Sequence, residues 1–189
     1  MNWYIPTLES DEYDALDYVD SNDDKVLSYF WGFDTSYDPE APGGFRSNRL
    51  PYFPDTWQPI QVEKYPAKKA DILSLVGFMT ITQHALSYLK PLLGEAILLP
   101  VFCGEEILYV VREEEIDCLN YEKAIVDRYD NGAVSEIEEF ALLHQKLEGK
   151  HIFRFPEIII TSLVSQTFKD VVEQNNLFGM SFRKITELI

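Results

Sequence analysis

Apolar residues follow strand-like and helix-like patterns most clearly between residues 151 and 182. Residues 152–155 and 158–160 are mostly β-branched or aromatic, a composition that is typical of strands. Residues 180–182 can form a further strand after an intervening helix. This stretch therefore predicts a strand–helix–strand unit.

The helix in this unit is predicted by its ends as well as by its periodicity. Ser165 stands where the hydroxyl of an N-cap residue would be. Phe168, Val171 and Val172 follow at helical spacing. Two asparagines and a glycine in residues 175–179 are residue types that end helices.

A second strand–helix unit is predicted in the middle of the chain. Residues 71–76 are an apolar run that indicates a strand, and Thr82 is a candidate N-cap. One helical face then carries Ala85, Leu86, Leu89, Leu92 and Leu93. Pro91 and Gly94 mark the end of this helix.

The two predicted helices begin alike. Ile81-Thr82-Gln83 opens the first and Val164-Ser165-Gln166 opens the second, each a β-branched residue followed by a hydroxyl and a glutamine. The match covers about a dozen residues. It suggests two similar strand–helix units, one on each side of a central β meander.

The segment between these units has a β pattern. Residues 96–102 indicate a buried strand, residues 104–106 can turn, and residues 107–111 can pair back as a hairpin. Residues 116–119 and 123–128 continue the β pattern, and residues 130–132 contain an Asn-Gly turn of the kind that hairpins favour. Residues 134–140 and 142–147 fit either strand or helix.

The first third of the chain has a different composition. Residues 1–66 hold seven of the ten prolines and all three tryptophans, so we expect an acidic, loop-rich extension (1–66) packed on an α+β domain (67–189). Residues 3–5 indicate a short strand. Residues 9–24 contain eight acidic residues and no basic residue, and Tyr13, Leu16 and Val19 recur every three positions, which permits a short amphipathic helix. Residues 31–50 are rich in turns and aromatics, and we expect this loop to dock on the core or to form a binding surface.

The charge of the chain is strongly unbalanced. Sixteen Lys and Arg stand against 32 Asp and Glu, a formal net charge of −16. Such a surface repels nucleic acid and anionic membranes and attracts basic partners, although an acidic composition also serves solubility alone. The start of the chain has no basic segment followed by an apolar one, so we expect a cytoplasmic protein.

The sequence contains no motif for catalysis or for metal binding. His84, His144 and His151 have no partner at metal-ligand spacing, and no nucleophile motif of the G-x-S-x-G type is present. Cys103 and Cys118 are expected to be reduced thiols. The acidic runs 113–115 and 136–139 show no surrounding pocket signal. We therefore expect no catalytic residue, no metal and no cofactor, and a protein that is not an enzyme.

The order of these signals from residue 71 to residue 183 resembles a family of bacterial immunity proteins. The motifs that carry the resemblance are Asp71-Ile72-Leu73, Thr82, Leu89-Lys90-Pro91-Leu92, Leu99-Pro100-Val101, Asp117-Cys118-Leu119-Asn120-Tyr121-Glu122-Lys123, Ile152-Phe153-Arg154-Phe155, Val164-Ser165, Phe168-Lys169 and Gly179-Met180-Ser181-Phe182. Family members are found beside the toxins of polymorphic toxin systems, and related domains were first catalogued as of unknown function. Taken together, the strand and helix signals predict an α+β fold with a mixed or mostly antiparallel sheet, two principal helices and a loop-rich N-terminal third.

The resemblance also implies a function by binding, in which an immunity protein occupies its cognate toxin. The acidic charge favours a basic toxin, and neither nucleic acid nor a membrane is an expected partner. The oligomeric state does not follow from the sequence. For the contact surface we expect acidic residues together with aromatic anchors, namely Asp11, Glu12, Asp14, Asp17, Trp31, Phe33 and Tyr37. The alternatives are a ligand-binding or regulatory domain of the same fold, and a hydrolase that uses a carboxylate pair.

Overall fold

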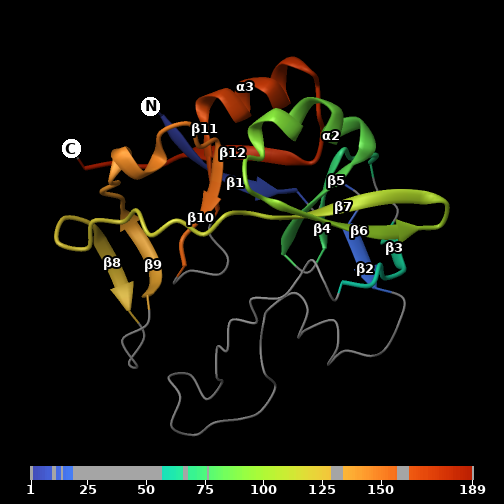
Figure 1. Cartoon of the computed structure of the whole chain (residues 1–189), viewed down its shortest axis with the longest axis horizontal. Helices are drawn as coiled ribbons and strands as arrows, with labels where there is room; N and C mark the ends of the chain where they lie inside the picture. Colours follow the sequence, from blue (N-terminus) through green and yellow to red (C-terminus); the bar gives the residue numbers. More distant parts are fainter. Residues whose placement is uncertain are drawn as a thin grey trace, which may run out of the picture.

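The computed structural model describes residues 2–9, 12–13, 15–18, 57–65, 68–75, 77–128, 134–156 and 162–188. In these residues two α-helices accompany strands in antiparallel and mixed sheets, so the predicted α+β class is confirmed (Figure 1). The described strands form a four-stranded sheet, a six-stranded sheet and a separate hairpin, where one sheet was expected. The first third of the chain is predicted to be rich in loops, but most of its residues lie outside those described.

The four-stranded sheet joins the beginning of the chain to its end. Its order is β10 (Ile152–Arg154), β11 (Ser162–Ser165), β1 (Trp3–Leu8) and β12 (Met180–Lys184), and every pair is antiparallel. The strands predicted at residues 3–5, 152–155 and 180–182 are thereby confirmed, whereas residues 158–160 lie outside the described residues.

Side chains alternate between the two faces of this sheet, as the two-residue period of a strand requires. Tyr4 and Val164 belong to a core shared with the helices, whereas Trp3 and Leu163 face a second core on the opposite side. In that second core the rings of Trp3 and Phe153 meet edge to face, with centroids 5.0 Å apart. Both faces of the sheet are therefore covered.

The six-stranded sheet has the order β3-β2-β4-β5-β7-β6 and contains one parallel pair, β2 with β4. Its strands are β2 (Ala15–Tyr18), β3 (Val62–Tyr65), β4 (Ile72–Leu75), β5 (Phe78–Thr82), β6 (Ile97–Cys103) and β7 (Glu106–Arg112). The strand predicted at residues 71–76 and the hairpin predicted at residues 96–111 are confirmed. The sequence does not predict β5, the strand that directly precedes the helix.

This sheet curls until its first strand approaches its last. Gln61, next to β3, forms a parallel bridge with Phe102 of β6, and the Phe102 N–H donates to the Ile60 carbonyl at 2.9 Å. The curled sheet encloses a third core, which contains Leu16, Val62, Leu73, Leu75, Phe78, Leu99, Val101, Leu108 and Val110.

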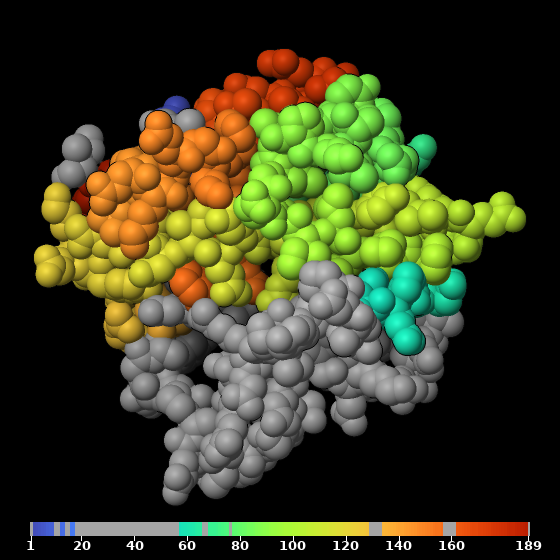
Figure 2. Space-filling model, viewed as in Figure 1, coloured from blue at the N-terminus to red at the C-terminus, as the bar shows by residue number. Residues whose placement is uncertain are grey.

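Two helices, α2 (Gln83–Leu89) and α3 (Gln166–Gln174), lie side by side over the sheets in the described part of the chain, as Figures 1 and 2 show. The Thr82 hydroxyl accepts from the Ala85 N–H at 3.1 Å, and the Ser165 hydroxyl accepts from the Phe168 N–H at 3.2 Å. Both predicted N-caps are thus confirmed, and each follows directly on a strand. After α2 the chain continues through the 3₁₀ turn Lys90–Leu92.

The remaining described strands, β8 (Ile125–Arg128) and β9 (Val134–Glu139), form an antiparallel hairpin that covers the second core. Residues 113–124 cross the molecule from β7 to this hairpin (Figure 1). The β pattern expected at residues 116–119 is present only as isolated bridges. Residues 144–147, which were ambiguous, form the 3₁₀ turn His144–Leu147, and residues 130–132 lie outside the described residues.

The amphipathic helix considered for residues 9–24 is wrong where the structure describes them. Residues 15–18 form β2, which is antiparallel to β3 and parallel to β4. Leu16 is buried in the third core beside Leu75, so pairing with neighbouring strands overrides the three-residue spacing of the apolar side chains. Strands from the first 66 residues thus belong to both large sheets, while the expected division between residues 1–66 and 67–189 stays a prediction.

Candidate functional site

The acidic stretch at residues 9–24 begins directly after β1 of the four-stranded sheet and includes β2 of the six-stranded sheet. Glu12 is exposed and its carboxylate lies 3.0 Å from the Lys68 ammonium group. Asp17, on β2, accepts a hydrogen bond from the Tyr65 hydroxyl at 3.2 Å, and this bond raises the pKa of Tyr65. Two of the predicted contact residues are therefore described, Glu12 just before β2 and Asp17 on it, each with a partner. The other five, Asp11, Asp14, Trp31, Phe33 and Tyr37, lie outside the described residues.

The acidic run at residues 113–115 is a structural connection between the two large sheets. Glu113 accepts a hydrogen bond from the Ser162 hydroxyl at 3.1 Å, Glu114 pairs with Lys150 at 2.6 Å, and Glu115 pairs with Arg154. Backbone bonds join the same segment to β10, since the Arg154 N–H donates to the Glu114 carbonyl at 3.0 Å. These side-chain partners lie 36 to 49 positions away, so no local sequence pattern could indicate them.

Burial changes the titration of this network. Removal from water raises the pKa of Glu113, although the positive charges of Arg154 and Arg112 and the Ser162 hydrogen bond oppose the shift. Burial and the nearby Arg154 charge lower the pKa of Arg112. The cations and carboxylates of this network compensate one another locally.

The histidines do not form a metal site in the part of the chain that the structure describes. Nδ1 of His84 lies 2.8 Å from Asp71, Nδ1 of His151 lies 3.0 Å from the Ser165 hydroxyl, and His144 pairs with Glu187. Among the described residues no group of three or more His, Cys, Asp or Glu side chains could hold a metal ion.

Both cysteines are free thiols, as the sequence predicts. Cys118 is completely buried in the second core, and this burial raises the pKa of its thiol to about 12. A thiol with so high a pKa is a poor nucleophile at neutral pH. Cys103 is half-buried at the end of β6.

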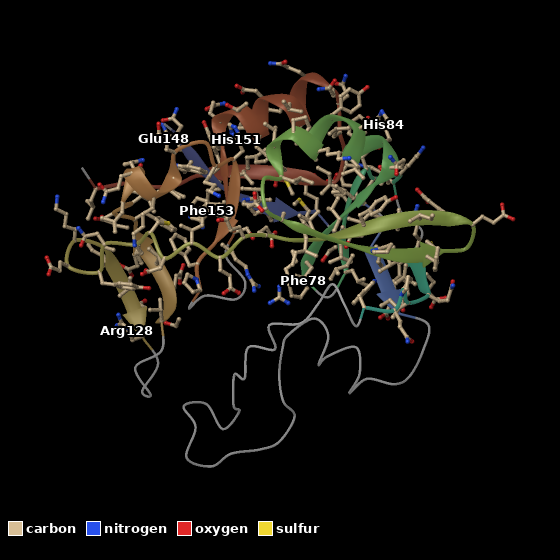
Figure 3. The ribbon with its side chains drawn as sticks, viewed as in Figure 1. Phe78, His84, Arg128, Glu148, His151 and Phe153 are labelled. Atoms are coloured by element: carbon tan, nitrogen blue, oxygen red, sulfur yellow. The ribbon has the colours of Figure 1, made fainter. Side chains whose placement is uncertain are left out.

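An open depression of about 400 Å³ lies beside the 3₁₀ turn His144–Leu147, and it is lined by Trp3, His144, Gln145, Leu147 and Glu148. Among these described lining residues the only carboxylate is that of Glu148, which Figure 3 shows near the surface. A hydrolase of the kind considered above needs two carboxylates that face one substrate. The described lining of this depression does not provide such a pair.

Comparison with known protein families gives a match in the second half of the chain. Residues 107–187 match the model of an immunity protein family, Imm11. Over these residues the match confirms the resemblance to an immunity protein family that the motifs indicated. A search of curated proteins found no match.

The matched region runs from β7 to the segment after β12, and it therefore contains the whole unit formed by β10, β11, α3 and β12. The motifs at residues 117–123, 152–155, 164–169 and 179–182 lie inside it. The matched region is preceded by the motifs at residues 71–73, 82–92 and 99–101. Only the resemblance supports these motifs. None of the helices in the described residues is both long enough and apolar enough to cross a bilayer.

Proposed function

We propose that this chain is an immunity protein of a polymorphic toxin system, which neutralises its cognate toxin in the cytoplasm by protein–protein contact and without a cofactor. The observation that carries the proposal is the match of residues 107–187 to the immunity protein family. In this role the protein is an inhibitor rather than an enzyme. Neutralisation follows when the inhibitor covers the toxin's active site or another surface that the toxin needs.

The net charge of −16 supports a basic toxin as the partner. Opposite charges accelerate the encounter of two proteins, and rapid capture is useful when the partner is harmful to the cell that makes it. We propose that Asp11, Glu12, Asp14 and Asp17 contribute to this attraction, together with the aromatic side chains of Trp31, Phe33 and Tyr37. Glu12 is compatible with this role because it is exposed, and Asp17 lies half-buried on β2, between β3 and β4.

Co-expression with the product of the adjacent gene tests the proposal. If that product arrests growth of a bacterial host, we expect this chain to restore growth and to co-purify with it in a stable complex. An unrelated protein of similar net charge is the control, because it separates specific binding from charge neutralisation. If this chain neither rescues growth nor forms a complex, the proposal is wrong.

A further inference from the structure

An exposed aromatic cluster lies where β4, α2 and the turn before β12 meet. The ring of Phe178 is 51% exposed and stacks on Tyr13, with centroids 6.4 Å apart. Tyr88 is 40% exposed, and its ring meets that of His84 edge to face at 5.4 Å. Figure 3 shows His84 on α2 at the surface. We call Tyr13, His84, Tyr88 and Phe178 the aromatic cluster.

Asp71 holds the two halves of the aromatic cluster together. One carboxylate oxygen lies 2.8 Å from Nδ1 of His84, and the other accepts the Phe178 N–H at 3.3 Å. The Phe178 carbonyl in turn accepts the N–H groups of Asp71 and Ile72, each at 3.0 Å. The backbone that carries the exposed rings is therefore fixed before any partner arrives, which lowers the entropic cost of binding through them.

The acidic stretch at residues 9–24 begins beside this cluster. The Glu9 N–H donates to the carbonyl of Gly179, the residue next to Phe178, at 3.0 Å. The carboxylate of Glu12 lies 3.0 Å from Lys68, whose ammonium group lies 5.7 Å from the centre of the Tyr13 ring. The exposed rings thus lie beside Glu9 and Glu12, which are described residues of the acidic stretch.

We infer that the aromatic cluster is the anchor by which this protein holds a basic face of its cognate toxin, an inference that rests on the proposed function. Exposed aromatic rings bordered by charged residues are the usual composition of the energetic centre of a protein–protein interface. Glu9 and Glu12 lie beside the cluster and, together with the net charge of −16, favour a positively charged partner, although Glu12 already pairs with the exposed Lys68. Lysine or arginine side chains of the toxin would lie on the faces of Phe178 and Tyr88, as Lys68 lies over Tyr13 within the chain itself.

Four variants test this inference against the purified product of the adjacent gene. Phe178→Ala and Tyr88→Ala each remove one exposed ring. Ile125→Ala and Ile107→Ala are matched controls, because these side chains are 45% and 42% exposed but lie on β8 and at the β6–β7 hairpin. We expect each aromatic variant to raise the Kd by about 30-fold, mainly through faster dissociation, and each control to change it by less than about 3-fold.

Thermal unfolding of each variant separates lost binding from lost structure. We expect both aromatic variants to unfold within a few degrees of the wild type, because the removed rings are largely exposed. Tyr88→Ala is the safer of the two, since alanine is compatible with α2, whereas Phe178→Ala also removes the stacking of Phe178 on Tyr13.

The outcomes distinguish the inference from the proposed function. If the wild type binds the toxin and both aromatic variants bind within about 3-fold of it, the anchor lies elsewhere and the inference is overturned while the function stands. If the wild type itself does not bind, the proposed function fails, and the inference fails with it. Protection of Phe178 and Tyr88 from hydroxyl-radical labelling in the complex would support the assignment.

Discussion

Among single residues, Gly179 illustrates a position that only one amino acid fits. Its φ is +106°, and a Cβ built on it would lie 1.9 Å from the Ile72 carbonyl oxygen. The close approach lets the chain turn from α3 into β12 and lets Phe178 bond to Asp71. The sequence suggested a helix-ending glycine, whereas the structure shows a contact between two backbones.

Gly179→Ala should therefore destabilise the protein by at least about 3 kcal/mol, because it combines an unfavourable φ with a steric clash. Gly104→Ala is the matched control. Gly104 also has a positive φ, +61°, but has nothing within 4 Å of the Cβ position, so we expect a loss of about 1–2 kcal/mol. Urea denaturation measures both. If both variants lose the same free energy of unfolding, the predicted steric clash at Gly179 is wrong.

Glu113 is a second residue for which burial gives a specific prediction. Its pKa is raised in the folded protein, so between the unfolded and folded pKa values the folded state binds more protons than the unfolded state. The contribution of Glu113 to the free energy of unfolding is therefore greatest at low pH and falls as pH rises through this range.

Glu113→Gln removes this titration while keeping an oxygen that can accept from Ser162. We expect the free energy of unfolding of the variant, relative to the wild type, to increase as pH rises from about 4 to 8. Denaturation at a series of pH values measures the difference. Glu138→Gln, at an exposed position of β9, removes one carboxylate in the same way and is measured beside it for comparison. A flat or falling difference for Glu113→Gln would contradict the raised pKa.

Among the elements, two strand–helix junctions repeat the same construction. β5 ends at Thr82 and β11 ends at Ser165, and each hydroxyl caps the helix that follows. Both helices then place apolar side chains in the same core, Leu86 and Leu89 from α2 and Phe168 and Val172 from α3. The similarity of Ile81-Thr82-Gln83 to Val164-Ser165-Gln166 thus corresponds to two similar local structures whose helices lie side by side.

Removal of either cap should weaken the fold by a similar amount. We expect Thr82→Ala and Ser165→Ala each to lower the free energy of unfolding by about 1 kcal/mol, because each leaves a buried backbone N–H without its acceptor. Thr82→Ser keeps the hydroxyl and is the control. If Thr82→Ala proves as stable as Thr82→Ser in urea denaturation, the cap makes no net contribution.

Across the molecule as a whole, the acidic side chains serve different roles in different regions. Within residues 113–115, Glu114 and Glu115 pair with Lys150 and Arg154, and Glu113 accepts a hydrogen bond from Ser162. The acidic stretch at residues 9–24 contains no basic residue, and in its described part Glu12 pairs with Lys68 at a position where both side chains are largely exposed to solvent. The second region is therefore the better source of long-range attraction to a basic toxin.

Reversal of Asp11, Glu12, Asp14 and Asp17 to lysine tests this attraction. A matched control reverses four exposed residues elsewhere, Glu105, Glu122, Glu138 and Glu148. Each reversal replaces one negative charge with one positive charge, so either set of four changes the formal net charge from −16 to −8. We expect the first set to slow association with the toxin about tenfold more than the control at low salt, with the difference shrinking at high salt. Equal association rates for both sets at low salt would rule out a special role for this stretch.

Features that depend on neighbours in the chain could be predicted from the amino-acid sequence. Thr82 and Ser165 were identifiable as caps because capping joins a side chain to a backbone group three residues later. The β6–β7 hairpin was predictable because its strands are adjacent and turn at Gly104. The α+β class and the resemblance to an immunity protein family follow from such local signals taken in order.

Features that depend on distant residues became visible only in the folded chain. Residues 15–18 form a strand rather than a helix because β3 and β4 offer hydrogen-bonding partners that the local spacing does not reveal. Curling of the six-stranded sheet, the side-chain bonds of residues 113–115 and the stacking of Phe178 on Tyr13 all join segments far apart in sequence. Local pattern cannot specify such contacts, because they arise only when separate elements pack on common cores. The proposed binding surface is of this second kind.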